Sequence, residues 1–208
     1  MCNHYRNVPG AEQLLPTWRE YIAWSLKPIT ANDGAAEDVW PKRRALVVRA
    51  GEDGAVIDAM AWGVPHRMAG KRPGTTVTRH VTNVRNLASP FWRSMLARPE
   101  QRCLVPFTRF AEPKPGAGRE EVWFHVPGET TSAFAGIWRP SEAGAVFAFL
   151  TCEPNPLVAP IHPKAMPVIL HPGDYQRWLD GAPAAELAVP FPSQLMGIAT
   201  NDGATEEQ

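Results

Sequence analysis

The feature that most constrains the fold is the spread of 22 prolines through a chain of 208 residues. Proline has no backbone N–H and fixes φ near −65°, so it interrupts helices and the inner strands of sheets. No repeat or low-complexity linker divides the chain. We therefore expect one α+β domain built from many short elements, and the hydrophobic content of 44% is sufficient for one core.

Strand patterns outnumber helical ones. A Gly-Glu-Asp-Gly turn at 51–54 separates two apolar runs and predicts a hairpin. Further strands are predicted at 102–107, 121–126, 132–138, 145–151 and 166–170. Helices are predicted at 14–26, at 91–97 and at 174–179, the second beginning behind Ser89 as N-cap and Pro90 as the first helical residue. Few βαβ crossovers fit, which favours a curved, mainly antiparallel, barrel-like sheet with short flanking helices. The domain is expected to span 1–200, with a disordered polar tail at 201–208.

The second residue carries the most distinctive chemistry. Cys2 directly follows the initiator Met1, whose removal would leave a cysteine with a free α-amine and a free thiol. Such an amine attacks aldehydes, and the thiol then closes onto the imine to form a thiazolidine. The same group also suits an N-terminal nucleophile for amide cleavage, and an incidental cysteine is the alternative to both.

The zero net charge conceals an uneven distribution. Residues 62–110 carry nine basic residues, eight of them Arg, against the single acid Glu100. Residues 111–208 carry five basic residues against twelve acidic ones. An Arg-rich segment of this kind indicates a surface for a polyanion, because Arg contacts phosphate in a bidentate way. A face paired with the acidic third by salt bridges is the alternative.

Several classes are disfavoured. The first ten residues contain no apolar signal-peptide core, and no apolar run approaches 18 residues. Cysteines at 2, 103 and 152 suggest no disulfide framework, and the six histidines show no metal-ligand spacing. We expect a monomeric cytoplasmic protein without metal or cofactor.

Two further residues lie where burial would perturb them. Glu112 follows a predicted strand, and a desolvated carboxyl there would have the raised pKa of a general acid/base. His162 stands in the apolar string Leu-Val-Ala-Pro-Ile-His. For each residue alone, a structural role is the alternative.

Taken in order, these strings resemble one family. They are Met1-Cys2, Trp62-Gly63, Asn83-Val84-Arg85, the Arg-Cys-Leu-Val-Pro run from 102 with Glu112, the run ending at His162, and Met-Pro-Val-Ile-Leu from 166. The chain closely resembles the SOS response-associated peptidase (SRAP) family over residues 1 to about 170.

The resemblance implies a protein that senses abasic sites in single-stranded DNA and links to them covalently through Cys2, bound to the nucleoid when on DNA. It implies that Asn83 orients the reacting groups, that Glu112 shuttles protons and that His162 assists ring opening. It also implies a phosphate contact for Arg85. The remaining expected DNA-binding residues are Trp62, Pro41, Thr151, Arg67 and Arg79, with Trp62 or Trp92 available for base stacking.

The chain departs from the family pattern at several positions. Asn3 stands where glycine is usual, and the segment after Trp62 is shorter and less aromatic. The residues after Asn83 and after Glu112 also differ from the usual ones. These differences affect the expected DNA groove more than the reacting residues.

Three function classes follow. The first is covalent capture of abasic sites. The second is a cysteine peptidase, limited in the narrowest case to removal of Met1. The third is a nucleic-acid-binding module in which Cys2 is incidental.

Overall fold

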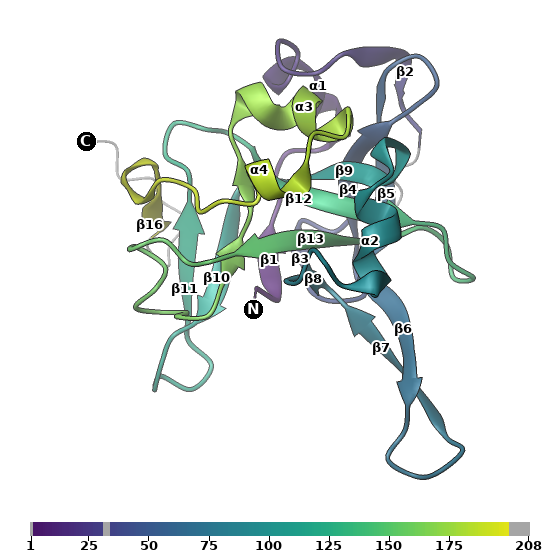
Figure 1. The fold of residues 1–208 in the computed structure, drawn as a ribbon. Helices are drawn as coiled ribbons and strands as arrows, with labels where there is room; N and C mark the ends of the chain where they lie inside the picture. Colours follow the sequence, from purple (N-terminus) through teal and green to yellow (C-terminus); the bar gives the residue numbers. More distant parts are fainter. Residues whose placement is uncertain (1, 31–33, 200–208) are drawn as a thin grey trace.

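Two sheets and a separate two-stranded ribbon form most of the computed structural model, which describes residues 2–30 and 34–199 (Figure 1). The strands are β1 (His4–Arg6), β2 (Trp24–Ile29), β3 (Asp38–Val39), β4 (Arg44–Ala50), β5 (Ala55–Trp62), β6 (Val64–Ala69), β7 (Thr76–Val81), β8 (Asn83–Val84), β9 (Arg102–Phe107), β10 (Arg109–Pro113), β11 (Glu121–His125), β12 (Ser132–Arg139), β13 (Val146–Cys152), β14 (Met166–Pro167), β15 (Ile169–Leu170) and β16 (Gly197–Ala199). The helices are α1 (Ala11–Thr17), α2 (Pro90–Leu96), α3 (Tyr175–Leu179) and α4 (Ala184–Leu187), with short 3-10 turns η1 (Pro99–Gln101), η2 (Pro172–Asp174) and η3 (Ser193–Leu195).

The larger sheet curls into a barrel. Its strands follow the order β14-β13-β12-β9-β4-β5-β2, and an additional parallel pairing joins β13 to β5. That pairing closes β13, β12, β9, β4 and β5 into a ring. The expected α+β fold with a curved, mainly antiparallel sheet in a single domain is therefore confirmed.

Both faces of this sheet are buried, and they bury different side chains. Along β9, Cys103, Val105 and Phe107 belong to one core cluster, whereas Leu104 belongs to the other. This alternation follows from the two-residue period of a strand. The first of these clusters, here the aromatic core, contains seven phenylalanines as well as Cys2. The second cluster is richer in aliphatic residues and packs against α1, α2 and α3.

The smaller sheet carries the start of the chain. Its order is β16-β11-β10-β1-β3, so β1 lies between β10 and β3. The pairing is antiparallel, with His4 opposite Ala111 and Tyr5 opposite Phe110. Cys2 thereby enters the structure beside the end of β10, where Glu112 lies.

The β6–β7 ribbon extends away from the barrel (Figure 1). It leaves β5 at Gly63, whose φ of 129° is disfavoured for any residue with a Cβ atom. A Cβ there would also lie 3.0 Å from the His80 Cβ atom. Near the barrel, His66 stacks on Phe91 of α2 with the ring centroids 4.1 Å apart. The ribbon is thus anchored at its base and exposed toward its tip.

Several element predictions are confirmed. The hairpin is β4–β5, the strand at 102–107 is β9, and α2 begins at Pro90 behind Ser89. The predicted helix at 14–26 is wrong beyond Thr17. Pro16 lies in the last turn of α1, and residues 24–29 form β2 because they pair in parallel with β5. The predicted strand at 166–170 is divided into β14 and β15, which pair with different strands.

The helices are short, at most seven residues long among those described. Over 2–30 and 34–199, none is long and apolar enough to cross a membrane. Residues 201–208, where a disordered tail is expected, lie outside the described part of the chain, and so does Met1.

Candidate active site around Cys2

Cys2 lies within the aromatic core, with only 1% of its surface exposed. Its Sγ atom is 3.5 Å from the backbone carbonyl oxygen of His4. Burial raises the pKa of the Cys2 thiol well above its ordinary value, and the negative charge of Glu112 raises it further. The thiol is therefore protonated at neutral pH.

Asn83 contacts the backbone of Cys2 directly. Its Nδ2 atom donates to the Cys2 carbonyl oxygen at 3.0 Å and to the Thr82 hydroxyl at 2.8 Å. The side chain is buried, and β8 is itself fixed by parallel pairing with β13, where Asn83 lies opposite Phe149. The sequence predicted this residue as part of the site, and the structure places it next to Cys2.

Glu112 is fully buried on β10, opposite Val122 of β11. Burial raises the pKa of its carboxyl group to about 7, and the negative charge of Glu121 acts in the same direction. A group with a pKa near neutrality both donates and accepts protons at physiological pH. Its charge also acts on the Cys2 thiol, which places the two groups in one electrostatic environment.

His162 lies in the loop between β13 and β14. Its Nδ1 atom is 2.7 Å from the Ala165 carbonyl oxygen. When Nδ1 carries the proton and donates to this oxygen, Nε2 is the basic atom. Burial lowers the pKa of His162 below its ordinary value, and the positive charge of Arg85 contributes to the lowering. The imidazole is therefore neutral at pH 7, and Arg85, two residues after Asn83, lies close enough to influence it.

Asn155 shapes the loop that carries His162. Its Oδ1 atom accepts hydrogen bonds from the backbone N–H groups of Leu157 and Val158, at 3.1 and 3.0 Å. Its Nδ2 atom donates to the Phe191 carbonyl oxygen at 2.7 Å. The buried amide thus ties the loop to the C-terminal segment. Asn155 is not among the site residues predicted from the sequence.

The two tryptophans expected to stack on bases are buried. Trp62 has 0% of its surface exposed, stacks on Phe149 at 5.1 Å and donates from Nε1 to the Thr82 carbonyl oxygen at 3.1 Å. Trp92 is 5% exposed and belongs to the second core cluster, the one richer in aliphatic residues. The structure therefore leaves neither ring face open to a base, and a stacking role for either tryptophan would require the surrounding residues to move. Trp62 instead supports the strand end that precedes Gly63.

The other expected DNA contacts differ in exposure. Pro41 is exposed in the turn before β4, and Arg85 is exposed behind β8. Thr151 is buried on β13, where its hydroxyl lies 3.4 Å from the Val84 carbonyl oxygen. Thr151 therefore contacts β8 from inside the fold, and its burial leaves no surface for a DNA contact.

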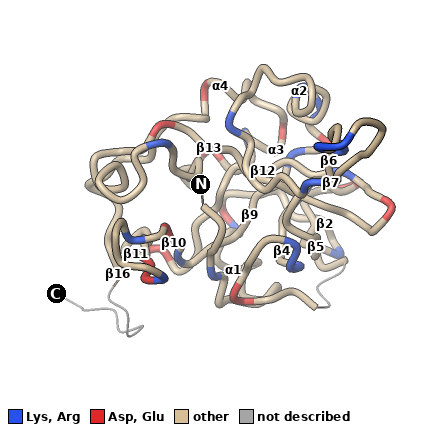
Figure 2. The backbone as a smooth tube through the Cα atoms, turned by 90° about the horizontal axis from the view of Figure 1, so that it is seen from below, with Lys and Arg blue, Asp and Glu red and all other residues tan. Residues whose placement is uncertain are grey.

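Arg67 and Arg79 are both exposed on the ribbon, but they point to opposite sides of it. His66 lies opposite Arg79, and Arg67 lies opposite Thr78. Neighbouring pairs of a ribbon alternate between its faces. Basic residues mark this ribbon and the adjacent α2 in Figure 2. The two arginines therefore cannot contact one nucleic-acid strand from the same face.

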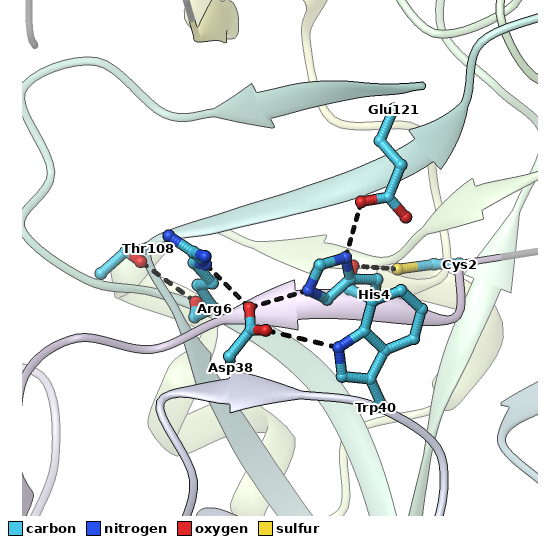
Figure 3. Close-up of polar contacts among 7 residues, drawn as sticks. All are labelled: Cys2, His4, Arg6, Asp38, Trp40, Thr108 and Glu121. Atoms are coloured by element: carbon cyan, nitrogen blue, oxygen red, sulfur yellow. Dashed lines mark hydrogen bonds and ion pairs between the residues drawn. The ribbon is translucent and has the colours of Figure 1, made fainter. Parts of the chain in front are cut away.

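A polar cluster around His4 was not predicted. His4 hydrogen-bonds to Glu121 and Asp38, and Arg6 also contacts Asp38 (Figure 3). The only signal in the sequence is the position of His4 two residues after Cys2. Its partners are 34 and 117 residues away, which no local pattern reveals.

Within the described ranges, no group of three or more His, Cys, Asp or Glu side chains is arranged to hold a metal ion. The other two cysteines are free thiols inside the fold. Burial raises the pKa of Cys152 to about 12, and it raises the pKa of Cys103 as well. Like Cys2, both thiols are therefore protonated at neutral pH.

Fold and site together define a class of protein. It is a barrel-like α+β domain whose second residue, a buried cysteine, lies beside a buried carboxyl group. A family model described as SOS response associated peptidase (SRAP) matches residues 1–200, and the chain belongs to this family. A search of curated proteins found no match.

Solved structures share the fold. A crystal structure of a protein from Bordetella bronchiseptica has 24% identity and a TM-score of 0.71, covering 95% of this chain and 98% of its own. A protein from Bacteroides thetaiotaomicron has 20% identity and a TM-score of 0.71, covering 97% and 93%. A phage-related protein from Bordetella bronchiseptica has 19% identity and a TM-score of 0.65, covering 95% and 93%.

Proposed function

We propose that this chain, after loss of Met1, captures abasic sites in single-stranded DNA as a covalent adduct at Cys2. The observation that carries the proposal is the placement of a buried glutamate, with a pKa of about 7, in the electrostatic environment of the second residue. Such a group can take up and release protons as an amine condenses with an aldehyde. The membership in a family associated with the SOS response agrees with a role in DNA damage.

The reaction proceeds in two bond-forming steps. The ring-opened sugar of an abasic site exposes an aldehyde at C1′, and the Cys2 α-amine adds to it. Glu112 donates a proton to the departing oxygen, so water leaves and an imine forms. The Cys2 sulfur then adds to the imine carbon, its proton passes to the nitrogen, and a thiazolidine results. The net change is the loss of one water, and no oxidant is needed.

The neighbouring side chains have distinct roles. Asn83 holds the Cys2 carbonyl at 3.0 Å and so fixes the direction of the amine. His162, neutral at pH 7, accepts the proton of the sugar hydroxyl during ring opening. Arg85, exposed beside it, contacts a neighbouring phosphate.

The exposed basic residues form the path of the DNA. Pro41 follows Trp40, which stacks on His4, and Arg85 lies close enough to His162 to influence its pKa. Arg67 and Arg79 extend the positive charge onto the ribbon. Because the two ribbon arginines face opposite sides, each contacts a different segment of the strand. Such contacts make affinity dependent on salt.

Intact-mass measurement tests the proposal. The protein is incubated with a single-stranded oligonucleotide carrying one abasic site, and the control oligonucleotide carries a tetrahydrofuran analogue that has no aldehyde. We expect a protein without Met1 and an adduct equal to protein plus DNA minus one water, with the natural site only. A protein without Met1 that forms no adduct would contradict the proposal.

A Cys2→Ser variant divides the two chemical steps. It retains the α-amine but lacks the thiol, so the imine forms but does not close to a thiazolidine. We expect no stable adduct by mass, and an adduct that appears when a hydride reductant is added. A stable adduct without reductant would show that the thiol takes no part.

The family description favours a second candidate, a cysteine peptidase. A peptidase cysteine attacks as the thiolate, in an electropositive site that lowers its pKa. Because burial and Glu112 raise the pKa of Cys2, a peptidase reaction here would need the Cys2 α-amine as the base that activates the thiol. Cleavage of a peptide by the protein, abolished in Cys2→Ser, together with no DNA adduct would establish the peptidase.

A further inference from the structure

The His4 ring lies between two carboxylate side chains. Its Nδ1 atom lies 2.7 Å from Oε2 of Glu121, and its Nε2 atom lies 2.8 Å from Oδ1 of Asp38 (Figure 3). A neutral imidazole has one N–H group and donates only once, whereas the protonated ring donates from both nitrogens. Only the protonated ring can therefore donate to both carboxylates.

The ring joins three strands of the smaller sheet. Asp38 comes from β3, His4 from β1 and Glu121 from β11. The imidazole also stacks on Trp40 with the centroids 3.8 Å apart and meets the edge of Trp123 at 4.6 Å. His4 itself is 4% exposed, but the Asp38 side chain is 46% exposed and that of Glu121 only 20%, so the contact with Glu121 is the better shielded from water and salt.

Two arginines also lie close to this cluster. Arg6 of β1 donates to Asp38 at 2.7 Å, and the guanidinium of Arg109 of β10 lies 5.0 Å from the Trp123 ring centroid. Burial alone would raise the pKa of Asp38, but hydrogen bonds from Arg6 and His4 lower it overall. Asp38 therefore remains ionised, as the contact with the imidazolium requires.

Glu121 connects His4 to the reactive end. The negative charge of Glu121 raises the pKa of both Cys2 and Glu112. The His4 ring lies 2.7 Å from this carboxylate, and its protonated form would oppose the carboxylate's charge. The backbone is connected as well, because the Cys2 thiol lies 3.5 Å from the His4 carbonyl oxygen.

We propose that His4 is a positioning residue for the Cys2 reaction: as an imidazolium between Asp38 and Glu121, it fixes the strand behind Cys2 and offsets the Glu121 charge beside the reacting groups. This inference rests on the proposed function. The two parts of the role predict different results, one in the rate of adduct formation and one in its pH dependence.

The test compares His4→Gln, Glu121→Gln and Asp58→Asn at saturating abasic-site DNA across a pH series. Asp58 is the matched control, because it forms a partly buried ion pair with Arg49 at 3.0 Å in the β4–β5 hairpin. His4→Gln should slow adduct formation about tenfold through loss of positioning. It should also move the midpoint governed by Glu112 to higher pH, because the charge of Glu121 is then unopposed.

Glu121→Gln should move that midpoint to lower pH, since it removes the charge that raises the Glu112 pKa. Asp58→Asn should change neither rate nor midpoint. DNA affinity should be unchanged in all three. A rate that falls equally at every pH in His4→Gln, or a His4→Gln protein identical to wild type, would overturn the inference.

The nitrogen chemical shifts of the His4 ring, measured by NMR in the wild-type protein, test the imidazolium without any reaction. Both ring nitrogens should carry protons at pH 7, and a neutral tautomer would overturn the inference. A wild-type protein that forms no adduct would instead refute the proposed function, so the two failures are distinguishable.

Discussion

The reactive end and the ribbon are opposites in their surroundings. Cys2, Asn83 and Glu112 are buried, and Asn83 and Glu112 lie in paired strands. Arg67 and Arg79, by contrast, are exposed on a ribbon that leaves the barrel at Gly63. Burial shifts pKa values at the first region, while the second presents charges that water and salt screen. The difference indicates that the chemistry and the binding can be changed separately.

The largest expected effect is that of Glu112→Gln, which acts on the chemistry alone. Without an ionisable group, adduct formation at saturating DNA should slow about a hundredfold. Affinity for the tetrahydrofuran oligonucleotide, measured by fluorescence anisotropy, should not change. A loss of affinity that accompanies the slower reaction would show that Glu112 also contributes to DNA binding.

The same variant should be more stable at high pH. The folded-state pKa of Glu112 is raised from 4.5 to about 7, so its contribution to stability is complete below pH 4.5 and is lost as the pH rises through 7. The amide that replaces the carboxyl group in the variant is neutral throughout. Urea unfolding should show a gain of roughly 3 kcal/mol at pH 8 and none at pH 4. An equal gain in the free energy of unfolding at pH 4 and at pH 8 would show that the ionisation of Glu112 is not its cause.

The double change Arg67→Ala and Arg79→Ala acts on the binding alone. Affinity should fall about tenfold in low salt, and the slope of log affinity against log salt should decrease by roughly 0.7 for each lost phosphate contact. The rate at saturating DNA should stay that of wild type. Lys27→Ala, which removes an exposed charge from β2, is the control and should leave the affinity unchanged. If the double variant binds DNA as tightly as the wild-type protein, the ribbon does not contact the DNA.

The smallest expected effect is that of Trp62→Phe at the junction of the two regions. It removes the hydrogen bond to the Thr82 carbonyl and some buried volume. The free energy of unfolding should decrease by about 1.5 kcal/mol, with DNA affinity unchanged. A fall in affinity without loss of stability would restore a base-stacking role for this ring.

The sequence predicted the barrel strands better than the elements around them. The hairpin β4–β5 and strand β9 were found because apolar runs and a glycine turn mark them locally. The ribbon was missed because Pro65, His66 and Arg67 lack the apolar alternation of a half-buried strand. Strand β2 was taken for helix because its strand conformation depends on parallel pairing with β5, which no nearby residue signals.

In the site, too, residues marked by local sequence motifs were predicted, and contacts that form only on folding were missed. Cys2, Asn83, Glu112 and His162 were identified through motifs that surround each residue, and the structure ties Asn83 and Glu112 to Cys2. The burial of Trp62 was not foreseen, because an aromatic beside a glycine looks the same in sequence whether its ring is covered or open. The His4 cluster depends on strands brought together only by folding.

The burial of Cys2 also determines how long the protein keeps its reagent. Oxidation of a cysteine follows its exposure and its thiolate fraction, and both are low here. In the proposed reaction Cys2 is consumed in a single turnover, so its thiol must stay reduced until that reaction takes place. The aromatic core that encloses the Cys2 thiol therefore protects it from oxidation, which under the proposed function sets how long the protein remains able to react.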